Sequence, residues 1–181
     1  IILLNLQKEQ EIEKMFNNKI IFISGGTGSF GNKFVDVISK KYKPKKIIIF
    51  SRDEFKQFNM QSRFPVEKFP FLRFFLGDVR DLERLRSAMS NVDYVVHATA
   101  LKQVPSAEYN PIEFVKTNIY GAENIIRASI DCGVKKVLAL STDKAANPIN
   151  LYGATKFASD KIFLTANNIV GKQNTFFSVV R

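Results

Sequence analysis

Short apolar runs rich in β-branched residues alternate along the chain with longer segments of helical periodicity. The apolar runs fall at 19–23, 46–50, 72–76, 94–98, 136–141 and 175–180, and the helical patterns at 29–40, 81–89, 111–132 and 152–168. Near-continuous apolar strands are typical of a parallel sheet that helices cover on both faces. Because crossovers between parallel strands are right-handed, the sequence predicts an α/β doubly wound parallel sheet with strand order 3-2-1-4-5-6.

The size and composition of the chain suit one soluble domain. Residues 19–181 are predicted to form it, preceded by an N-terminal extension, residues 1–18. Cys132 is the only cysteine, so no internal disulfide can form, and a reducing, cytoplasmic compartment is expected. No apolar run reaches the ~18 residues of a membrane span, and residues 1–6 lack the basic start and cleavage site of a signal peptide.

The formal net charge is +10. Lys and Arg are scattered apart from the run 40–46, which is typical of a Lys-rich solvated surface; the alternative is attraction of anions such as nucleotide diphosphates. Nucleic-acid binding would require a basic stripe with interleaved aromatic residues, and the sequence shows none. No nucleic-acid partner is therefore expected, and the phenylalanines are assigned mostly to the core.

A glycine pattern, G-x-x-G-x-x-G, directly follows the first predicted strand and opens a predicted helix. Such glycines permit a tight turn and let the backbone approach a pyrophosphate, while the helix N-terminus presents free N–H groups. The alternative is a plain glycine turn, but the position between strand and helix favours a dinucleotide-binding loop and hence a Rossmann fold. The loop residues expected to contact the cofactor are Gly25, Thr27, Gly28, Ser29, Phe30 and Gly31.

The end of the second predicted strand indicates which dinucleotide is bound. An acidic residue here usually takes the ribose 2′-OH of NAD, whereas a guanidinium suits the 2′-phosphate of NADP. Ser51 and Arg52 come first, so NADP is predicted; the alternative is that Arg52 only pairs with Asp53 or Glu54. Asp78 is placed either to read the adenine amino group or to cap a turn. Further expected cofactor contacts are Ser51, Arg52, Asp53, Glu54, Lys56, Asp78, Val79, Ala98 and Lys102.

Tyr152 and Lys156 form a Y-x-x-x-K motif at the start of the last predicted helix. This spacing puts phenol and ammonium on one helix face, and a nearby cation favours the phenolate. The phenolate can take a proton from a substrate hydroxyl while hydride leaves the same carbon, and Lys156 can also hold the nicotinamide ribose. Taken alone, the Y-x-x-x-K motif also fits a pair of side chains on the surface of a helix. Ser141 and Thr142 either hydrogen-bond the substrate or merely end the fifth strand.

Asp143 and Lys144 follow the fifth predicted strand, at the edge where parallel sheets bind ligands. One interpretation is an acid–base pair in which Lys144 loses its proton and acts as a base. The other is a solvated charged turn. His97, the only histidine, lies within the fourth predicted strand and is interpreted as a core residue rather than a catalytic one.

These motifs together resemble the inverting UDP-N-acetylglucosamine 4,6-dehydratases, which are extended short-chain dehydrogenases/reductases. The similarity runs from about residue 19 to the end and is most specific in residues 141–156, STDKAANPINLYGATK. Ser24 stands where short-chain dehydrogenases usually have Thr, which keeps the hydroxyl, and Gln103 where relatives have His. The family continues beyond Arg181, so the resemblance implies an N-terminal fragment without the last sheet strands and most of the sugar-nucleotide pocket.

The resemblance also implies a reaction: NADP-dependent loss of water from UDP-N-acetylglucosamine, with inversion at C5, to a 4-keto-6-deoxy sugar. This is the first step towards pseudaminic acid for flagellin glycosylation, or towards a related surface sugar. Tyr152 and Lys156 would drive oxidation at C4, Lys144 would remove the C5 proton, and Asp143 would protonate the leaving C6 hydroxyl. Lys102 and Lys144 would contact the substrate, and no metal is implied. The catalytic residues implied are Thr142, Asp143, Lys144, Tyr152 and Lys156.

Two alternatives stay open at this point. Another extended short-chain dehydrogenase, such as a sugar-nucleotide C4 epimerase, would need no elimination pair at Asp143 and Lys144. A non-catalytic NADP-binding fragment would bind cofactor without turnover. Since relatives are oligomers, a homo-oligomer is expected, with the predicted helix 111–132 and the N-terminal extension as candidate surfaces.

Overall fold

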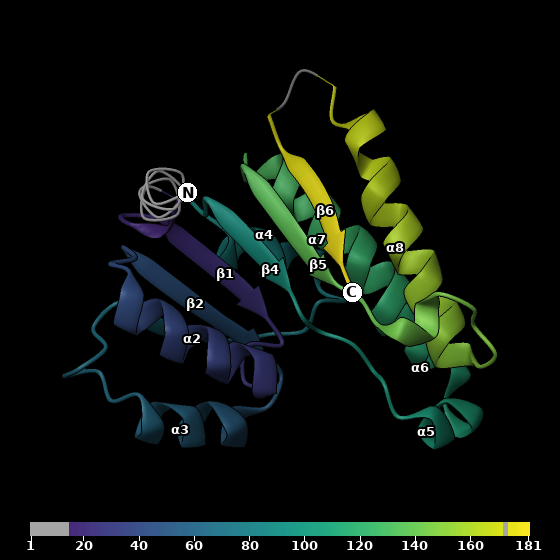
Figure 1. Cartoon of the computed structure of the whole chain (residues 1–181), viewed down its shortest axis with the longest axis horizontal. Helices are drawn as coiled ribbons and strands as arrows, with labels where there is room; N and C mark the ends of the chain where they lie inside the picture. Colours follow the sequence, from purple (N-terminus) through teal and green to yellow (C-terminus); the bar gives the residue numbers. More distant parts are fainter. Residues whose placement is uncertain (1–14, 172–173) are drawn as a thin grey trace, which may run out of the picture.

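A computed structural model describes residues 15–171 and 174–181. Its centre is a six-stranded parallel sheet of order β3-β2-β1-β4-β5-β6, so the predicted doubly wound topology is confirmed (Figure 1). Most of the predicted N-terminal extension lies outside the described residues. The strands are β1 (Ile20–Ser24), β2 (Lys46–Ser51), β3 (Leu72–Leu76), β4 (Tyr94–His97), β5 (Lys136–Leu140) and β6 (Phe176–Val180).

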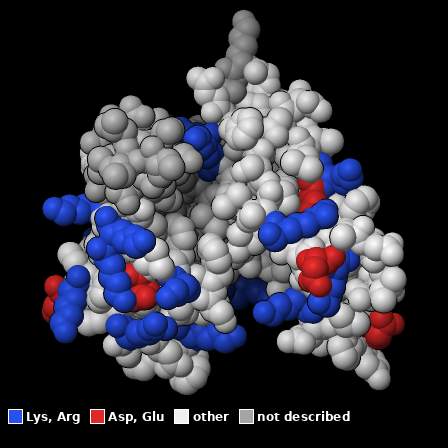
Figure 2. Space-filling view, viewed as in Figure 1, with Lys and Arg blue, Asp and Glu red and all other residues white. Residues whose placement is uncertain are grey.

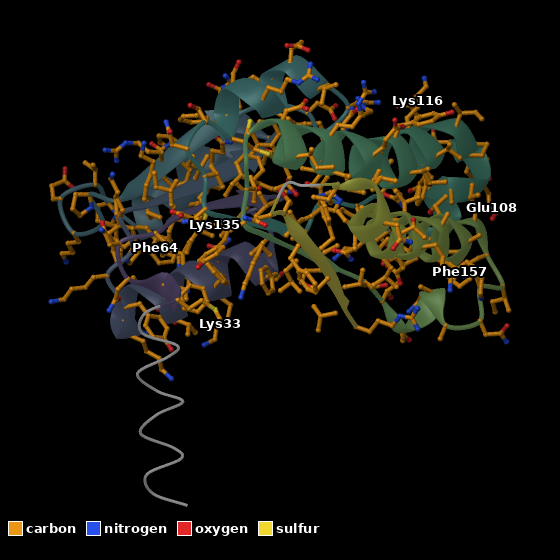
Figure 3. All side chains as sticks on the ribbon, turned by 90° about the horizontal axis from the view of Figure 1, so that it is seen from above. Lys33, Phe64, Glu108, Lys116, Lys135 and Phe157 are labelled. Carbon is orange, nitrogen blue, oxygen red and sulfur yellow. The ribbon has the colours of Figure 1, made fainter. Side chains whose placement is uncertain are left out.

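Helices lie on both faces of the sheet. Two of them, α2 and α3, pack on one face, and α4, α7 and α8 pack on the other; Figure 3 shows α2 on the side opposite α4 and α7. This division follows from right-handed crossovers that change side after β3. The helices are α2 (Ser29–Lys41), α3 (Glu54–Arg63), α4 (Leu82–Ala88), α5 (Val104–Tyr109), α6 (Pro111–Val115), α7 (Gly121–Asp131) and α8 (Leu151–Ile169).

The central strands explain why the apolar runs are continuous rather than alternating. Every residue of β1 is buried. Successive side chains of a strand point to opposite faces, so Ile21 and Ile23 pack with α2 while Phe22 packs with the core of α4 and α7. The sheet is therefore fixed by two separate cores, and its carboxyl edge is left to form the site.

The predicted helix at 111–132 differs from the structure in its middle. Between α6 and α7 lies a π-helical segment, Lys116–Tyr120. Asn110 occupies the N-cap position, but its amide donates to the Ser106 carbonyl and makes no side-chain cap. Gly133 ends α7 at φ +67°, as a C-terminal glycine does. The π-helical segment is a local deviation of the kind found at functional sites.

Candidate active site

A cleft of about 740 Å³ opens at the carboxyl edge of the sheet. Its walls come from the loop before α2, the ends of β2, β4 and β5, and the start of α8. Figure 2 shows this face of the molecule hollowed between the part that carries α2 and α3 and the part that carries α5 and α8, with Lys and Arg on both sides. This is the ligand-binding edge of doubly wound folds.

The cleft brings together most of the sequence-predicted residues. It is lined by Gly25, Thr27, Gly28, Ser29, Ser51, Arg52, Asp53, Lys56, Val79, Ala98, Lys102, Thr142, Tyr152 and Lys156. Six predicted cofactor or catalytic positions lie outside the lining: Phe30, Gly31, Glu54, Asp78, Asp143 and Lys144. All but Gly31 and Lys144 directly adjoin a lining residue in sequence. Lining residues that were given no cofactor role are Phe50, Gly77, Thr99, Ala100, Leu140 and Ser141.

The glycine loop is built around close backbone contacts. Gly25 has φ +67°, and a Cβ there would lie 2.9 Å from the Thr99 backbone nitrogen. A Cβ on Gly31 would lie 1.9 Å from the Gly26 carbonyl oxygen, so this third glycine seats α2 on the loop instead of lining the cleft. The first turn of α2 carries no acidic residue, which leaves its positive end open to an anion.

The end of β2 presents cations to the cleft while its acidic residues are engaged. Asp53 caps α3 by accepting from the Lys56 amide at 2.9 Å, and this bond is the main cause that lowers the pKa of Asp53. Arg52 Nη1 lies 3.6 Å from Asp78 Oδ2, not beside Asp53 or Glu54. Arg52 and Lys56 thus line the cleft here together with the carboxylate of Asp53, whose Oδ2 lies 3.5 Å from Lys56 Nζ.

Asp78 is held mainly by Arg80. Its Oδ1 accepts from the Arg80 amide at 3.0 Å, and its Oδ2 accepts from the Arg80 guanidinium at 2.7 and 2.9 Å. Burial tends to raise the pKa of Asp78, but these bonds from Arg80 and the charge of Arg52 outweigh it, and the net shift is downward. Asp78 thus makes the hydrogen bond expected of a turn-capping residue, and its role towards adenine stays a prediction.

Thr142, Asp143 and Lys144 form the turn that follows β5. Thr142 Oγ1 donates to Asp143 Oδ1 at 3.0 Å, and Lys144 Nζ lies 3.5 Å from the same oxygen. The Thr142 hydrogen bond, then the Lys144 charge, lower the pKa of Asp143. The side chains of Asp143 and Lys144 are 86% and 50% exposed, so the pair lies at the rim of the cleft with only Thr142 in its lining.

Tyr152 and Lys156 lie one turn apart on α8, both in the cleft wall and both buried. Lys156 Nζ donates to the Leu140 carbonyl at 2.8 Å. Burial lowers the pKa of Lys156, and the negative charge of Asp160 opposes this. Ser141 Oγ, also in the lining, donates to Asp160 Oδ2 at 2.6 Å, so its proton is directed away from a substrate.

His97 is a core residue, as predicted. It is 1% exposed, and its Nδ1 lies 2.7 Å from Ser24 Oγ. Burial, and then the charge of Lys156, lower the pKa of His97 to about 3. The ring is therefore neutral at physiological pH, and it ties the end of β4 to the end of β1 beneath the glycine loop.

Asn118 is a residue that the sequence analysis did not single out. It lies in the π-helical segment, and its amide accepts from Leu101 N and donates to Leu101 O, each at 2.9 Å. A further bond of 3.1 Å joins Asn118 to Thr155 Oγ1, beside Lys156. These bonds fix the segment that leads to Lys102. The sequence signal that could have identified Asn118 is a polar residue inside an apolar helical pattern.

The described residues contain neither a candidate membrane span nor a candidate metal cluster. In residues 15–171 and 174–181 no helix is both long and apolar enough to cross a membrane. The same residues contain no group of three or more His, Cys, Asp or Glu side chains placed to hold a metal ion.

Fold and site together define a class of protein: a Rossmann domain of the short-chain dehydrogenase/reductase type, with Tyr152 and Lys156 in a cleft at the carboxyl edge of its sheet. Residues 21–181 match the polysaccharide biosynthesis protein family, and the chain belongs to that family.

Two relatives illustrate the similarity in sequence. Over 167 residues the chain is 61% identical to the UDP-N-acetylglucosamine 4,6-dehydratase (inverting) of Campylobacter jejuni, a match that covers 92% of this chain and 49% of that protein. Over 173 residues it is 44% identical to the UDP-glucose 4-epimerase of Rickettsia akari, covering 92% and 49%. The chain thus spans about half the length of these relatives.

Two solved structures show the same fold. The structure of Pen from Bacillus thuringiensis matches with a TM-score of 0.87 and 41% identity, covering 92% of this chain and 50% of that one. DesIV, a dTDP-glucose 4,6-dehydratase from Streptomyces venezuelae solved with NAD and TYD bound, matches with a TM-score of 0.76 and 25% identity, covering 86% and 53%.

Proposed function

We propose that this chain binds NADP, with residues 19–181 as the binding domain, and supplies the reacting groups of an inverting UDP-N-acetylglucosamine 4,6-dehydratase. The observation that carries the proposal is one cleft that holds the glycine loop, Thr142, Tyr152 and Lys156, with the Asp143–Lys144 turn at its rim. The substrate is proposed from the 61% identity to the Campylobacter jejuni dehydratase.

The cleft fits an anionic dinucleotide. At Gly25 a side chain would fill the cradle beneath the Thr99 amide, and the positive end of α2 faces the same space. Arg52 and Lys56 add two cations at the end of β2, where a 2′-phosphate would lie. These cations favour NADP over the NAD found in DesIV. The glycine loop, Arg52 and Lys56 would hold the dinucleotide, whose nicotinamide would supply the acceptor for a hydride from sugar C4 and the donor of that hydride to C6.

The residues of this chain move the protons. Tyr152, as the phenolate that the Lys156 ammonium favours, takes the proton of the C4 hydroxyl. The resulting C4 ketone acidifies the C5 proton, and Lys144 is the base proposed to remove it. Asp143 gives a proton to the C6 hydroxyl, which leaves as water, and C5 is afterwards reprotonated on the opposite face with a proton that originates from solvent. Because Asp143 is exposed and ionised here, this role requires the bound sugar to cover the turn, since desolvation raises the pKa of a carboxyl.

One observation favours C4 epimerisation as a second candidate. The three groups needed for oxidation at C4, namely Thr142, Tyr152 and Lys156, line the cleft, whereas Asp143 and Lys144 do not. The 44% identity to a protein named UDP-glucose 4-epimerase agrees with this alternative. An epimerase returns the hydride to C4 and leaves the C5 proton in place.

Nuclear magnetic resonance of UDP-N-acetylglucosamine in D₂O with NADP separates these functions. The chain is tested beside a version completed with the C-terminal half of the Campylobacter jejuni relative. A 4-keto-6-deoxy product with deuterium at inverted C5 is expected. A C4 epimer without deuterium at C5 would establish the epimerase instead, and no turnover by either version would leave a cofactor-binding fragment. Lys144→Met should abolish the C5 deuterium, and Lys116→Met, in the π-helical segment and outside the cleft lining, serves as its control.

The family suggests where the product goes and how the protein assembles. We propose that the reaction serves a surface sugar in the cytoplasm, such as pseudaminic acid for flagellin, because the chain belongs to a polysaccharide biosynthesis family. We also propose a homo-oligomer, since Ile112 and Tyr120, in the region predicted for self-association, are 61% and 55% exposed. Light scattering of the parent and of Ile112→Glu tests assembly: the variant should lower the mass.

A further inference from the structure

Asp160 is a buried carboxylate behind the reacting pair. It lies one turn beyond Lys156 on α8 and is 3% exposed. Its Oδ2 accepts from Ser141 Oγ at 2.6 Å and from Arg181 Nη2 at 3.2 Å. Asp160 therefore connects α8 to the residue after β5 and to the residue after β6, at the end of the sheet where the cleft opens.

The buried charge of Asp160 has to be compensated by the groups around it. Burying an ionised group without compensation is strongly unfavourable. One partner, Ser141, is neutral, and the other, Arg181, is 46% exposed and so only partly screens the charge. The negative charge therefore also acts on the buried ammonium of Lys156, whose pKa it raises against the effect of burial. Without Asp160, burial alone would favour loss of the Lys156 proton.

The Asp160 carboxylate also gives the two hydroxyls after β5, those of Ser141 and Thr142, different hydrogen-bond partners. Ser141 lines the cleft, but its proton is given to Asp160. Thr142 donates to the exposed Asp143, a bond that a ligand can replace. Lys156 in turn holds the Leu140 carbonyl, immediately before these residues. The arrangement leaves Thr142 as the hydroxyl that is free to turn towards a substrate.

We propose that Asp160 is a positioning residue of the reacting centre, which keeps Lys156 in its ammonium form and holds Ser141 away from the substrate. The role rests on the proposed function, because it takes Tyr152 and Lys156 as the reacting pair. The ammonium matters because only a charged Lys156 favours the Tyr152 phenolate.

The other ionisable groups around Lys156 are few among the described residues. Tyr152 shares its helix, and His97 on β4 is neutral because burial and Lys156 lower its pKa to about 3. Arg181 follows β6, and Lys102 lies in the same cleft wall. Arg181 and Lys102 are cationic and His97 is neutral, so the Asp160 carboxylate is the group whose removal should destabilise the Lys156 ammonium.

The test is a titration of Lys156 in the chain labelled with ¹³C at the lysine ε carbons, with the Lys156 signal assigned from its absence in Lys156→Arg. Asp160→Asn keeps the shape and an acceptor for Ser141 but removes the charge, so the Lys156 midpoint should move to lower pH. Ser141→Ala keeps the charge, so its midpoint should stay near that of the parent. An unchanged midpoint in Asp160→Asn, with or without a lower melting temperature, overturns the proposal and leaves Asp160 a structural role.

A second variant tests the same interaction and is expected to shift the Lys156 midpoint in the opposite direction. Arg181→Gln removes an exposed cation that screens Asp160, so the Lys156 midpoint should move to higher pH. This variant decides the question if Asp160→Asn does not fold: an unchanged or lowered midpoint again overturns the proposal. The titration needs no turnover, so it remains readable if the dehydration itself is not observed. Where turnover is observed, the alkaline limb of kcat should follow the same shifts.

Discussion

Gly153 lies directly against the backbone carbonyl of Lys144: a Cβ on residue 153 would come 2.4 Å from that oxygen. The contact seats the turn after β5 on the first turn of α8, next to Tyr152. Close approach, rather than a left-handed backbone, requires glycine here, since Gly153 has no positive φ. Two groups of the proposed reaction, Lys144 and Tyr152, are thereby held at a fixed separation through a backbone contact.

Gly153→Ala is expected to push the turn away from α8. Overpacking a tight contact usually costs about 1–3 kcal/mol, so the free energy of unfolding should fall by that amount in a denaturant titration. Ala154→Ser, at the exposed next position, is the control and should change stability by less than about 0.5 kcal/mol. Equal stability of the two variants would mean that the turn moves aside without cost.

Gly25 and Gly133 provide a matched pair, because both have φ +67° but only Gly25 is crowded. Replacement by Ala should cost each about 1–2 kcal/mol from the left-handed backbone. A Cβ on Gly25 would also press on Thr99 N at 2.9 Å and occupy the phosphate cradle, whereas nothing lies within 4 Å of one on Gly133. Only Gly25→Ala should therefore abolish NADPH binding, measured by fluorescence titration. Equal affinities in the two variants would contradict the proposed cradle.

The sheet and the main motifs could be predicted because their signals are local. The continuous burial of β1 required a nearly unbroken apolar run, and at Gly28 and Gly31 the glycine spacing reports close backbone contacts made within the loop itself. Tyr152 and Lys156 share a helix face at i, i+4, so their proximity follows from helix geometry alone. By contrast, α3 was not predicted, because its exposed Phe55 and Phe58 obscure the amphipathic pattern.

The parts of the site that could not be predicted depend on contacts between distant segments. The sequence offered a 2′-phosphate as the partner of Arg52, or else Asp53 or Glu54, and it gave no sign of Asp78, which the end of the adjacent strand brings to within 3.6 Å. In the sequence, Asp160 is an ordinary polar position of a helix. Its contacts with Ser141 and Arg181 exist only because β5 and β6 bring these residues to it. No spacing rule encodes such pairs, since they arise from strand order and the length of each crossover.

Arg52→Ala tests the cofactor preference. If Arg52 binds the 2′-phosphate, losing a charge-assisted hydrogen bond should lower the ratio of NADP to NAD affinity by about tenfold or more, because such bonds contribute roughly 1.5–3 kcal/mol. Isothermal calorimetry with both dinucleotides measures the ratio. Arg127→Ala is the control, because Arg127 pairs with Glu123 on α7 and does not line the cleft. A ratio that stays constant in Arg52→Ala would mean that Arg52 serves only Asp78.

His97 gives the protein a specific dependence of stability on pH. In the folded chain its pKa is lowered to about 3, mainly by burial, whereas an unfolded histidine titrates near pH 6.5. Below pH 6.5 the unfolded chain therefore binds a proton that the folded chain does not. Stability that is present above pH 6.5 should be lost as the pH falls, approaching about 1.4 kcal/mol per pH unit.

The interval between about pH 5 and pH 6.5 isolates this effect, because His97 is the only histidine in the sequence. Carboxylates with a lowered pKa in the fold, such as Asp78 and Asp93, act in the same direction but mainly below about pH 5. His97→Asn keeps a partner for Ser24 Oγ and should flatten the dependence in this interval, as measured by denaturant unfolding at several pH values. Equal slopes of the free energy of unfolding against pH for the parent and His97→Asn would mean that His97 becomes protonated in the folded chain. That result would contradict the assignment of a buried, neutral ring beneath the glycine loop.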